Sequence, residues 1–239
     1  MRKLAIYVVL IACFGFLFMT EQAMARGFGA GAGKWTILTY EGEEGPFPYP
    51  VSSISGGGVY FEFLNTPDRA VLISDAKGKA SLVGRTVTAY IAIEATAGAT
   101  FNYYNTGGTL PANVRLYFQR VNGMGDSPTE ECPSGWHPER PDCEAQYWWS
   151  NPESISLADL AAIGISGEVL SANLDPALWS DRDGHMGDSN VDHQGWFADA
   201  VANMGKAGLS FGGGNNFAFG CGVNSPYLAN FDLFTFKIK

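Results

Sequence analysis

Short runs in which apolar and polar residues alternate recur along most of the chain, and turn-forming residues separate them. The run at 86–96 (TVTAYIAIEAT) is the clearest, because positions 87, 89, 91 and 93 are all apolar. The run at 114–121 repeats the pattern, with Leu116 and Phe118 on one side and Arg115 and Tyr117 on the other. Successive side chains of a strand point to opposite faces, so both runs predict strands with one buried face.

The same reading predicts further strands at 35–40, 59–64, 70–73, 101–104, 147–150, 167–174, 207–211, 217–223 and 231–238. A turn of helix is expected at 157–160. One short helix is predicted near 196–204, where Phe197, Val201 and Met204 recur at helical spacing and Gly205 follows. Many short strands with so little helix indicate an all-β, two-sheet β-sandwich. We expect one domain over 34–239, preceded by a Gly-rich flexible leader at 26–33.

The first 25 residues have the layout of a secretory signal peptide. Arg2 and Lys3 precede an apolar run at 4–19, and a small-x-small cleavage pattern ends at Ala25. We therefore expect a bacterial protein that is secreted, either extracellular or periplasmic, with a mature chain that begins at Arg26. A lipid anchor at Cys13 is the alternative. It is disfavoured because the apolar run continues past Cys13, where lipoproteins have polar tether residues.

Charge and composition argue against a nucleic acid partner and against a membrane span in the mature chain. The whole chain has 15 basic and 24 acidic residues, and residues 1–25 hold two and one of them, so the mature chain has a formal charge of −10. Binding to nucleic acid phosphates requires clustered Lys and Arg, which the sequence lacks, so no nucleic acid partner is expected. The sequence beyond residue 25 has no apolar run long enough to predict a membrane span.

The cysteines agree with export into an oxidising compartment. Cys132 and Cys143 enclose a polar, Pro-rich segment, which predicts a disulfide that closes a loop. A metal site that uses His137 is the alternative, but the wide cysteine spacing lacks a zinc pattern. Cys221 is left over and is expected to be a buried, inert residue of a Gly-rich strand.

A polar segment at 181–193 offers hard oxygen ligands, and Gly184 and Gly187 permit a tight turn within it. Such ligands suit Ca²⁺, although the spacing does not complete an EF-hand loop. The alternatives are a solvated acidic loop with Asx turns, or a transition-metal site at His185 and His193, which has no fixed helical spacing. The candidate Ca²⁺ ligands are Asp181, Asp183, Asp188 and Asp192.

Exposed aromatic rings are the second candidate for a binding site, because sugar rings pack their C–H faces on Trp and Tyr. Trp136 lies in the predicted disulfide loop. Trp148 and Trp149 are neighbours on a predicted strand, as are Tyr103 and Tyr104, so only one member of each pair can point inward. These five residues are the candidate ligand-binding residues, and packing in the core is the alternative for each strand residue.

No catalytic residues are assigned. A glycoside hydrolase needs two facing carboxylates, for which Glu62, Glu94, Glu153 and Glu168 are present, but the sequence pairs none of them. Nucleophile-elbow, zinc-protease and phosphate-loop motifs are absent from the sequence.

Several segments resemble exported bacterial jelly-roll domains of the laminin-B-type and galactose-binding-like sandwiches. They are 114–119 (VRLYFQ), 147–152 (YWWSNP), 178–181 (LWSD), 208–214 (GLSFGGG), 217–223 (FAFGCGV) and 229–233 (ANFDL). The resemblance implies a jelly-roll β-sandwich and covers most of the mature chain. Cys221 and the Cys132–Cys143 loop are local departures from it.

Together these features favour a secreted, non-catalytic binding domain whose ligand is extracellular polysaccharide. Contact is expected on a concave sheet face, or at the loops around Trp136 and 181–192. A structural protein of the extracellular matrix or envelope, which acts through protein–protein association, is the alternative, and a glycoside hydrolase is the third. A matrix protein predicts an apolar patch or unpaired sheet edges.

Overall fold

The computed structural model describes residues 35–41, 44–49, 52–53, 58–65, 71–73, 75–103, 110–120, 147–181, 183–213 and 220–239. The predicted signal peptide, the leader at 26–33 and the Cys132–Cys143 loop lie outside these residues.

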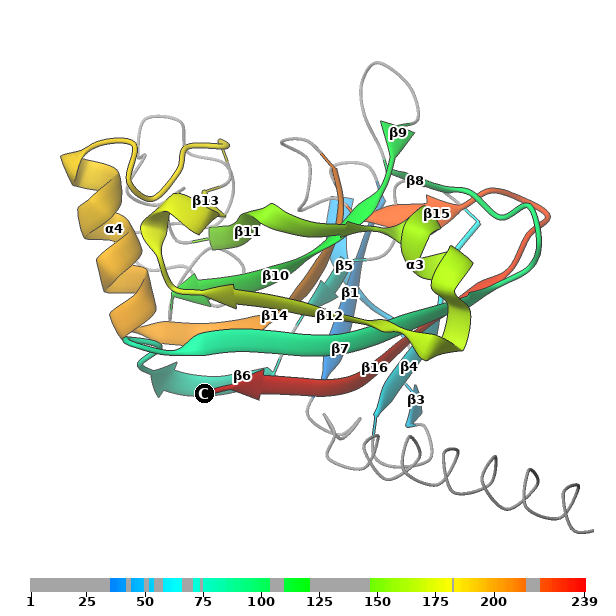
Figure 1. Cartoon of the computed structure of the whole chain (residues 1–239), viewed down its shortest axis with the longest axis horizontal. Helices are drawn as coiled ribbons and strands as arrows, with labels where there is room; N and C mark the ends of the chain where they lie inside the picture. The colour runs from blue at the N-terminus through cyan, green and yellow to red at the C-terminus, as the bar shows by residue number, and fades with distance from the viewer. Residues whose placement is uncertain are drawn as a thin grey trace, which may run out of the picture.

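Two five-stranded antiparallel sheets form the body of the molecule (Figure 1). The β10 sheet has the order β13-β11-β10-β14-β6, and the β7 sheet has the order β12-β7-β16-β4-β3. The strands of the β10 sheet are β6 (Asp75–Ala80), β10 (Asn113–Arg120), β11 (Tyr147–Ser156), β13 (Trp179–Ser180) and β14 (Met204–Gly212). Those of the β7 sheet are β3 (Ser52–Ser53), β4 (Val59–Glu62), β7 (Thr86–Ala95), β12 (Glu168–Asn173) and β16 (Ala229–Ile238).

Two three-stranded sheets complete the described strands, with the orders β2-β1-β5 and β15-β8-β9. Their strands are β1 (Thr36–Glu41), β2 (Glu44–Tyr49), β5 (Val71–Ile73), β8 (Phe101–Tyr103), β9 (Leu110–Pro111) and β15 (Cys221–Val223). The chain crosses repeatedly between the two large sheets, for example from β6 to β7, from β11 to β12, from β12 to β13 and from β14 to β16. Double-sheet crossing of this kind belongs to jelly-roll sandwiches, so the predicted all-β sandwich is confirmed.

The core lies between the two large sheets and is rich in aromatic rings. Phe211 of β14 contacts Phe231 of β16 with ring centroids 4.8 Å apart, and Phe61 of β4 lies 5.6 Å from Phe211. These three side chains are almost fully buried, which contributes about 1.5–3 kcal/mol each through apolar burial. Strands from both sheets are therefore held by the same cluster.

The burial of the central strands follows the alternation in the sequence. Val87, Ala89, Ile91 and Ile93 of β7 have no exposed surface, whereas Glu94 on the opposite face is exposed. On β10, Leu116 and Phe118 enter the main core and Tyr117 packs in a separate cluster. The strands predicted at 86–96 and 114–121 are thus confirmed with their inward faces, as β7 over 86–95 and β10 over 113–120, while Val121 lies outside the described residues.

Helices close the two ends of the sandwich (Figure 1). Helix α3 (Leu157–Ile163) lies at one end and continues into the 3₁₀ helix η2 (Gly164–Ser166). Helix α4 (Val191–Ala202) covers the other end. A further 3₁₀ helix, η3 (Pro176–Leu178), precedes β13. Phe197 of α4 packs edge-on against Trp148, with ring centroids 4.9 Å apart. None of the helices in the described part of the chain is long and apolar enough to cross a membrane.

The helix predicted near 196–204 exists, but its boundaries differ. It begins at Val191, because the Asn190 side chain caps it by accepting hydrogen bonds from the backbone N–H groups of Asp192 and His193. It ends at Ala202, and Met204 is the first residue of β14. Met204 is buried in the core, so its apolar character reflects a strand position.

Candidate functional site

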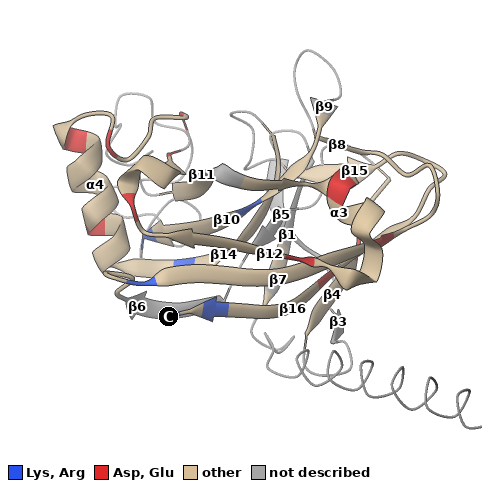
Figure 2. Cartoon of the chain, viewed as in Figure 1, with Lys and Arg blue, Asp and Glu red and all other residues tan. Residues whose placement is uncertain are grey.

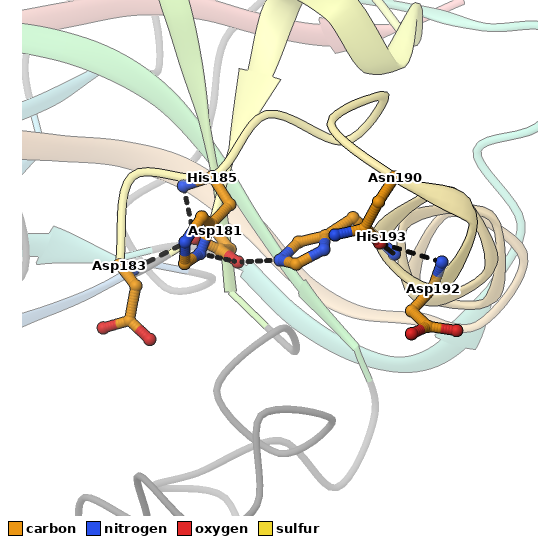
Figure 3. Close-up of polar contacts among 6 residues, drawn as sticks. All are labelled: Asp181, Asp183, His185, Asn190, Asp192 and His193. Atoms are coloured by element: carbon orange, nitrogen blue, oxygen red, sulfur yellow. Dashed lines mark hydrogen bonds and ion pairs between the residues drawn. The ribbon is translucent and has the colours of Figure 1, made fainter.

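Three potential metal ligands converge at the end of the sandwich that α4 covers (Figure 3). The Oδ2 atom of Asp181 lies 3.2 Å from Nε2 of His193 and 3.5 Å from Nδ1 of His185. One ligand atom from each of the three residues lies within 4.8 Å of the other two. The Asp181 side chain is only 3% exposed, His193 is also buried, and His185 is exposed to solvent. We refer to these residues as the Asp181 cluster.

A short hairpin positions Asp181 and His185. Ser180 and Met186 form an antiparallel bridge, and the backbone N–H of Asp181 donates to the carbonyl of His185 at 2.9 Å. The Oδ1 atom of Asp181 then accepts hydrogen bonds from the backbone N–H groups of Asp183 and His185, at 3.0 and 2.9 Å. The second carboxylate oxygen is consequently left facing the two imidazoles.

Helix α4 positions His193 in its first turn. The backbone N–H of His193 donates to Asn190 Oδ1 at 3.0 Å, so the helix cap also fixes the start of the helix next to the hairpin. The His193 ring packs edge-on against Trp196, with centroids 4.9 Å apart. Its Nδ1 atom is buried and has no hydrogen-bond partner among the described residues.

Burial dominates the electrostatics of the cluster. Desolvation raises the pKa of the Asp181 carboxyl above its ordinary value, and the nearby Asp183 acts in the same direction. The hydrogen bond from the His185 backbone and the two imidazoles act in the opposite direction. The net result is a raised pKa, so desolvation outweighs the contributions that favour the ionised carboxylate.

Only one of the four predicted Ca²⁺ ligands belongs to the cluster. The carboxylates of Asp183 and Asp192 point away from Asp181 (Figure 3), and both residues are exposed. Asp188 is exposed as well. The arrangement joins one carboxylate to two imidazoles, which are the ligands that Zn²⁺, Ni²⁺ and Cu²⁺ accept.

A second feature is an aromatic cluster on the outer face of the β10 sheet. Tyr117 and Trp149 are cross-strand partners on β10 and β11, with ring centroids 5.7 Å apart. The Tyr147 ring stacks on Trp149 at 6.0 Å and 14°, and lies 6.3 Å from Tyr117. We call these three residues the aromatic face. Tyr117 and Trp149 are buried, and Tyr147 is half-buried.

Polar side chains border the aromatic face. Gln119 is the cross-strand partner of Tyr147 on one side and of Lys206 on the other. The Tyr117 hydroxyl donates to Gln119 Oε1. Arg115 lies two residues before Tyr117 and therefore on the same face of the strand, and burial lowers the pKa of its guanidinium to about 10. Apolar rings and directional polar groups thus occur together.

The other predicted binding residues lie elsewhere. Trp148 is fully buried in the main core, so of the tryptophan pair only Trp149 is on the outer face, as strand alternation requires. Tyr103 is 6% exposed and lies against Gly213, where an added Cβ would come within 2.3 Å of the Tyr103 ring. Tyr104 and Trp136 lie outside the described residues. Neither Trp148 nor Tyr103 presents its ring to solvent, and Trp149 is itself only 5% exposed.

Charged side chains are distributed over the sheets (Figure 2). Basic residues lie on β10, β14 and β16 and at Arg85 immediately before β7, and acidic residues occur on α4 and the hairpin before it. Glu62, Glu94 and Glu168 are exposed. Glu62 and Glu94 are both cross-strand partners of Asn230, so one strand separates them on the β7 sheet.

The sequence suggests His185 and His193 as an alternative metal site and Trp149 as a ligand-binding residue, but it does not join Asp181 to the two histidines. Tyr117 and Tyr147 were not named as site residues, although aromatic residues alternate on both strands that carry them. The pairing of β10 with β11 across the intervening segment joins them, and sequence spacing alone does not reveal that register.

Comparisons with known proteins identify no family. No protein-family model matches the sequence, and no curated protein matches it. Among solved structures, the chain is similar to a xylan-binding module, CBM15, with 12% sequence identity and a TM-score of 0.39. The match covers 86% of this chain and 94% of that module. Similarity at this level carries no conclusion about what the chain binds.

Proposed function

We propose that the protein is an exported, non-catalytic domain that binds extracellular polysaccharide through the outer face of the β10 sheet. The observation that carries this proposal is the aromatic face, in which Tyr117, Tyr147 and Trp149 pack together apart from the main core. Export is supported by the signal-peptide layout of residues 1–25.

The chemistry of this face suits a sugar ring. Apolar C–H faces of a saccharide pack on aromatic rings, and polar groups at fixed positions determine its orientation. Tyr147 is the half-buried member of the aromatic face, so it is the ring that a ligand would contact first. Gln119 and Arg115 on β10 supply amide and guanidinium groups on the same side of the sheet.

The test is retention of the processed protein on a panel of insoluble polysaccharides, together with affinity electrophoresis in gels that contain soluble polysaccharides. Wild-type protein should bind at least one of them selectively. Tyr147→Ala should weaken that binding about tenfold, since an aromatic contact contributes up to ~1.5 kcal/mol and 1.4 kcal/mol corresponds to a factor of ten.

Tyr60→Ala is the matched control, because Tyr60 is also a half-buried tyrosine but lies on β4 of the opposite sheet. Its binding should equal that of wild type. Failure of the wild type to bind any polysaccharide, or equal losses in the two variants, would contradict the proposal.

One observation favours the alternative of protein–protein association. Among the described strands, β12 pairs only with β7, which makes it an edge of its sheet, and Val169 on this strand is 57% exposed. Ile163 at the end of α3 is 44% exposed. An edge strand with exposed apolar residues can pair with another chain. If polysaccharide binding fails, sedimentation of wild type and of Val169→Lys tests this alternative. The alternative predicts that wild type self-associates and that the lysine variant does not.

A further inference from the structure

The spacing of the ligand atoms in the Asp181 cluster suits a metal ion. Zn²⁺ binds imidazole nitrogen and carboxylate oxygen at about 2.0–2.2 Å, and in tetrahedral geometry two such ligand atoms lie about 3.4 Å apart. The Asp181 Oδ2 atom is 3.2 Å from His193 Nε2 and 3.5 Å from His185 Nδ1, which brackets that separation. The His185 contact at 3.5 Å is long for a hydrogen bond, whereas the His193 contact at 3.2 Å lies within hydrogen-bond range.

The cluster is also organised before any ion arrives. Two backbone N–H groups hold Oδ1 of Asp181, so Oδ2 is directed at the imidazoles without a change of rotamer. The hairpin bridge between Ser180 and Met186 fixes His185 on the same loop, and the Asn190 cap fixes His193. Ligands that the surrounding structure already orients lose little conformational freedom on binding a metal.

The burial of His193 keeps the nitrogen that faces Asp181 away from bulk solvent. His193 is 8% exposed, and its Nδ1 atom has no hydrogen-bond partner in the described part of the chain. A metal bound at Nε2 would leave the imidazole proton on Nδ1, so the ion would not satisfy that atom, and the support for the site comes from the position of Nε2. The Nε2 atom of this ring faces the Asp181 carboxylate at 3.2 Å.

We propose that Asp181 Oδ2, His185 Nδ1 and His193 Nε2 form a binding site for a divalent transition-metal ion such as Zn²⁺. One carboxylate and two imidazoles are three ligands, and three protein ligands leave a fourth tetrahedral position for water or another small ligand. The His185 side chain is 56% exposed, so the site has access to solvent on that side. Ca²⁺ is disfavoured because it takes 6–8 oxygen ligands, and a single carboxylate faces the site.

This site is separate from the aromatic face in its ligands, so the inference does not depend on the proposed polysaccharide binding. The two are nevertheless neighbours along the sheet, since Ser180, the residue before Asp181, is the cross-strand partner of Trp149. Because the two sites use different residues, metal binding can be measured without any glycan.

The test is calorimetric titration of the processed protein, stripped with a chelator and dialysed, with Zn²⁺ and separately with Ca²⁺. Wild type should bind one Zn²⁺ per chain. Co²⁺ should give visible absorption bands characteristic of tetrahedral coordination, which reports on the ligands directly. His185→Ala should weaken Zn²⁺ binding by at least about 100-fold, because loss of even an outer-shell partner costs 10–100-fold.

His185→Ala is suitable because the side chain is exposed, so the variant should fold, which near-ultraviolet circular dichroism verifies. Asp183→Asn is the matched control: it removes an exposed carboxylate two residues away whose side chain points out of the cluster (Figure 3), and it should bind Zn²⁺ as wild type does. The proposal is overturned if wild type binds no Zn²⁺, or if Zn²⁺ binding survives His185→Ala. Ca²⁺ binding that Asp183→Asn abolishes would also overturn it.

Discussion

Gly164 and Gly167 have nearly the same backbone conformation but different surroundings, and this makes them a matched pair for testing how closely η2 approaches β7. Their φ angles are both 64°, with ψ angles of −144° and −179°. This region of φ and ψ is almost restricted to glycine, and any other residue there costs about 1–3 kcal/mol. An alanine at either position should therefore destabilise the fold through backbone strain.

Only Gly167 adds a steric cost. A Cβ atom at Gly167 would lie 2.5 Å from the carbonyl oxygen of Ile91 and 3.0 Å from the Tyr90 ring, whereas a Cβ atom at Gly164 would have no neighbour within 4 Å. The Ile91 oxygen belongs to the central part of β7, so the backbone itself must shift. Such overpacking costs about 1–3 kcal/mol beyond the strain.

We therefore expect Gly164→Ala to lower the free energy of unfolding by about 1–3 kcal/mol, and Gly167→Ala to lower it by about 1–3 kcal/mol more. Equilibrium unfolding in urea measures both, and the difference should appear as a shift in midpoint at an unchanged slope. In a domain of this size each kcal/mol corresponds to roughly 2–4 °C in Tm. Equal losses in the two variants would refute the reasoning, because they would show that η2 is not held against β7.

Three further predictions concern the core, the helix cap and the cysteines. Phe118→Ala should cost about 3–5 kcal/mol in urea unfolding, since the ring is fully buried against two other aromatic rings; a loss below about 1 kcal/mol would contradict this packing. Asn190→Ala should cost about 1 kcal/mol by removing the cap of α4, and Asn190→Asp should retain most of the stability because aspartate also caps helices. Burial raises the pKa of the Cys221 thiol, so a thiol reagent should label it only after unfolding, as located by peptide mass spectrometry. Cys132 and Cys143 should remain unlabelled in unfolded, unreduced protein if their predicted disulfide forms, and labelling there would exclude it.

Much of the fold could be predicted from local alternation, because the burial of β7 and β10 follows the pattern of their residues. The segment after Ser150 shows the limit. The sequence Asn151-Pro152 indicates a turn, so the strand was predicted to end at 150, yet β11 continues to Ser156. Its register with β10 shifts between the Tyr117–Trp149 and Arg115–Ser154 pairs, which places the proline in an irregular stretch where its missing N–H is tolerated.

The candidate metal site could be predicted only in part. Asp181, His185 and His193 stand within 13 residues of one another, and their side chains suit a metal, but their spacing fits neither a single helix nor a standard loop. Two local features that the spacing does not reveal bring them together: the bridge between Ser180 and Met186, and the helix that begins after Asn190. Acidic character alone suggested Asp183, Asp188 and Asp192, because composition does not report the direction in which a carboxylate points.

The position of β16 has a consequence for how the chain reaches its native state. This strand is the last in chain order, yet it lies in the middle of its sheet between β7 and β4. Without residues 229–238, the sheet is divided into a β12-β7 pair and a β4-β3 pair, each with an unpaired edge. The backbone of Lys239 also exchanges hydrogen bonds with that of Thr86, across more than half of the chain. Closure of this sheet therefore requires residues 229–238, and contacts this distant in sequence form slowly.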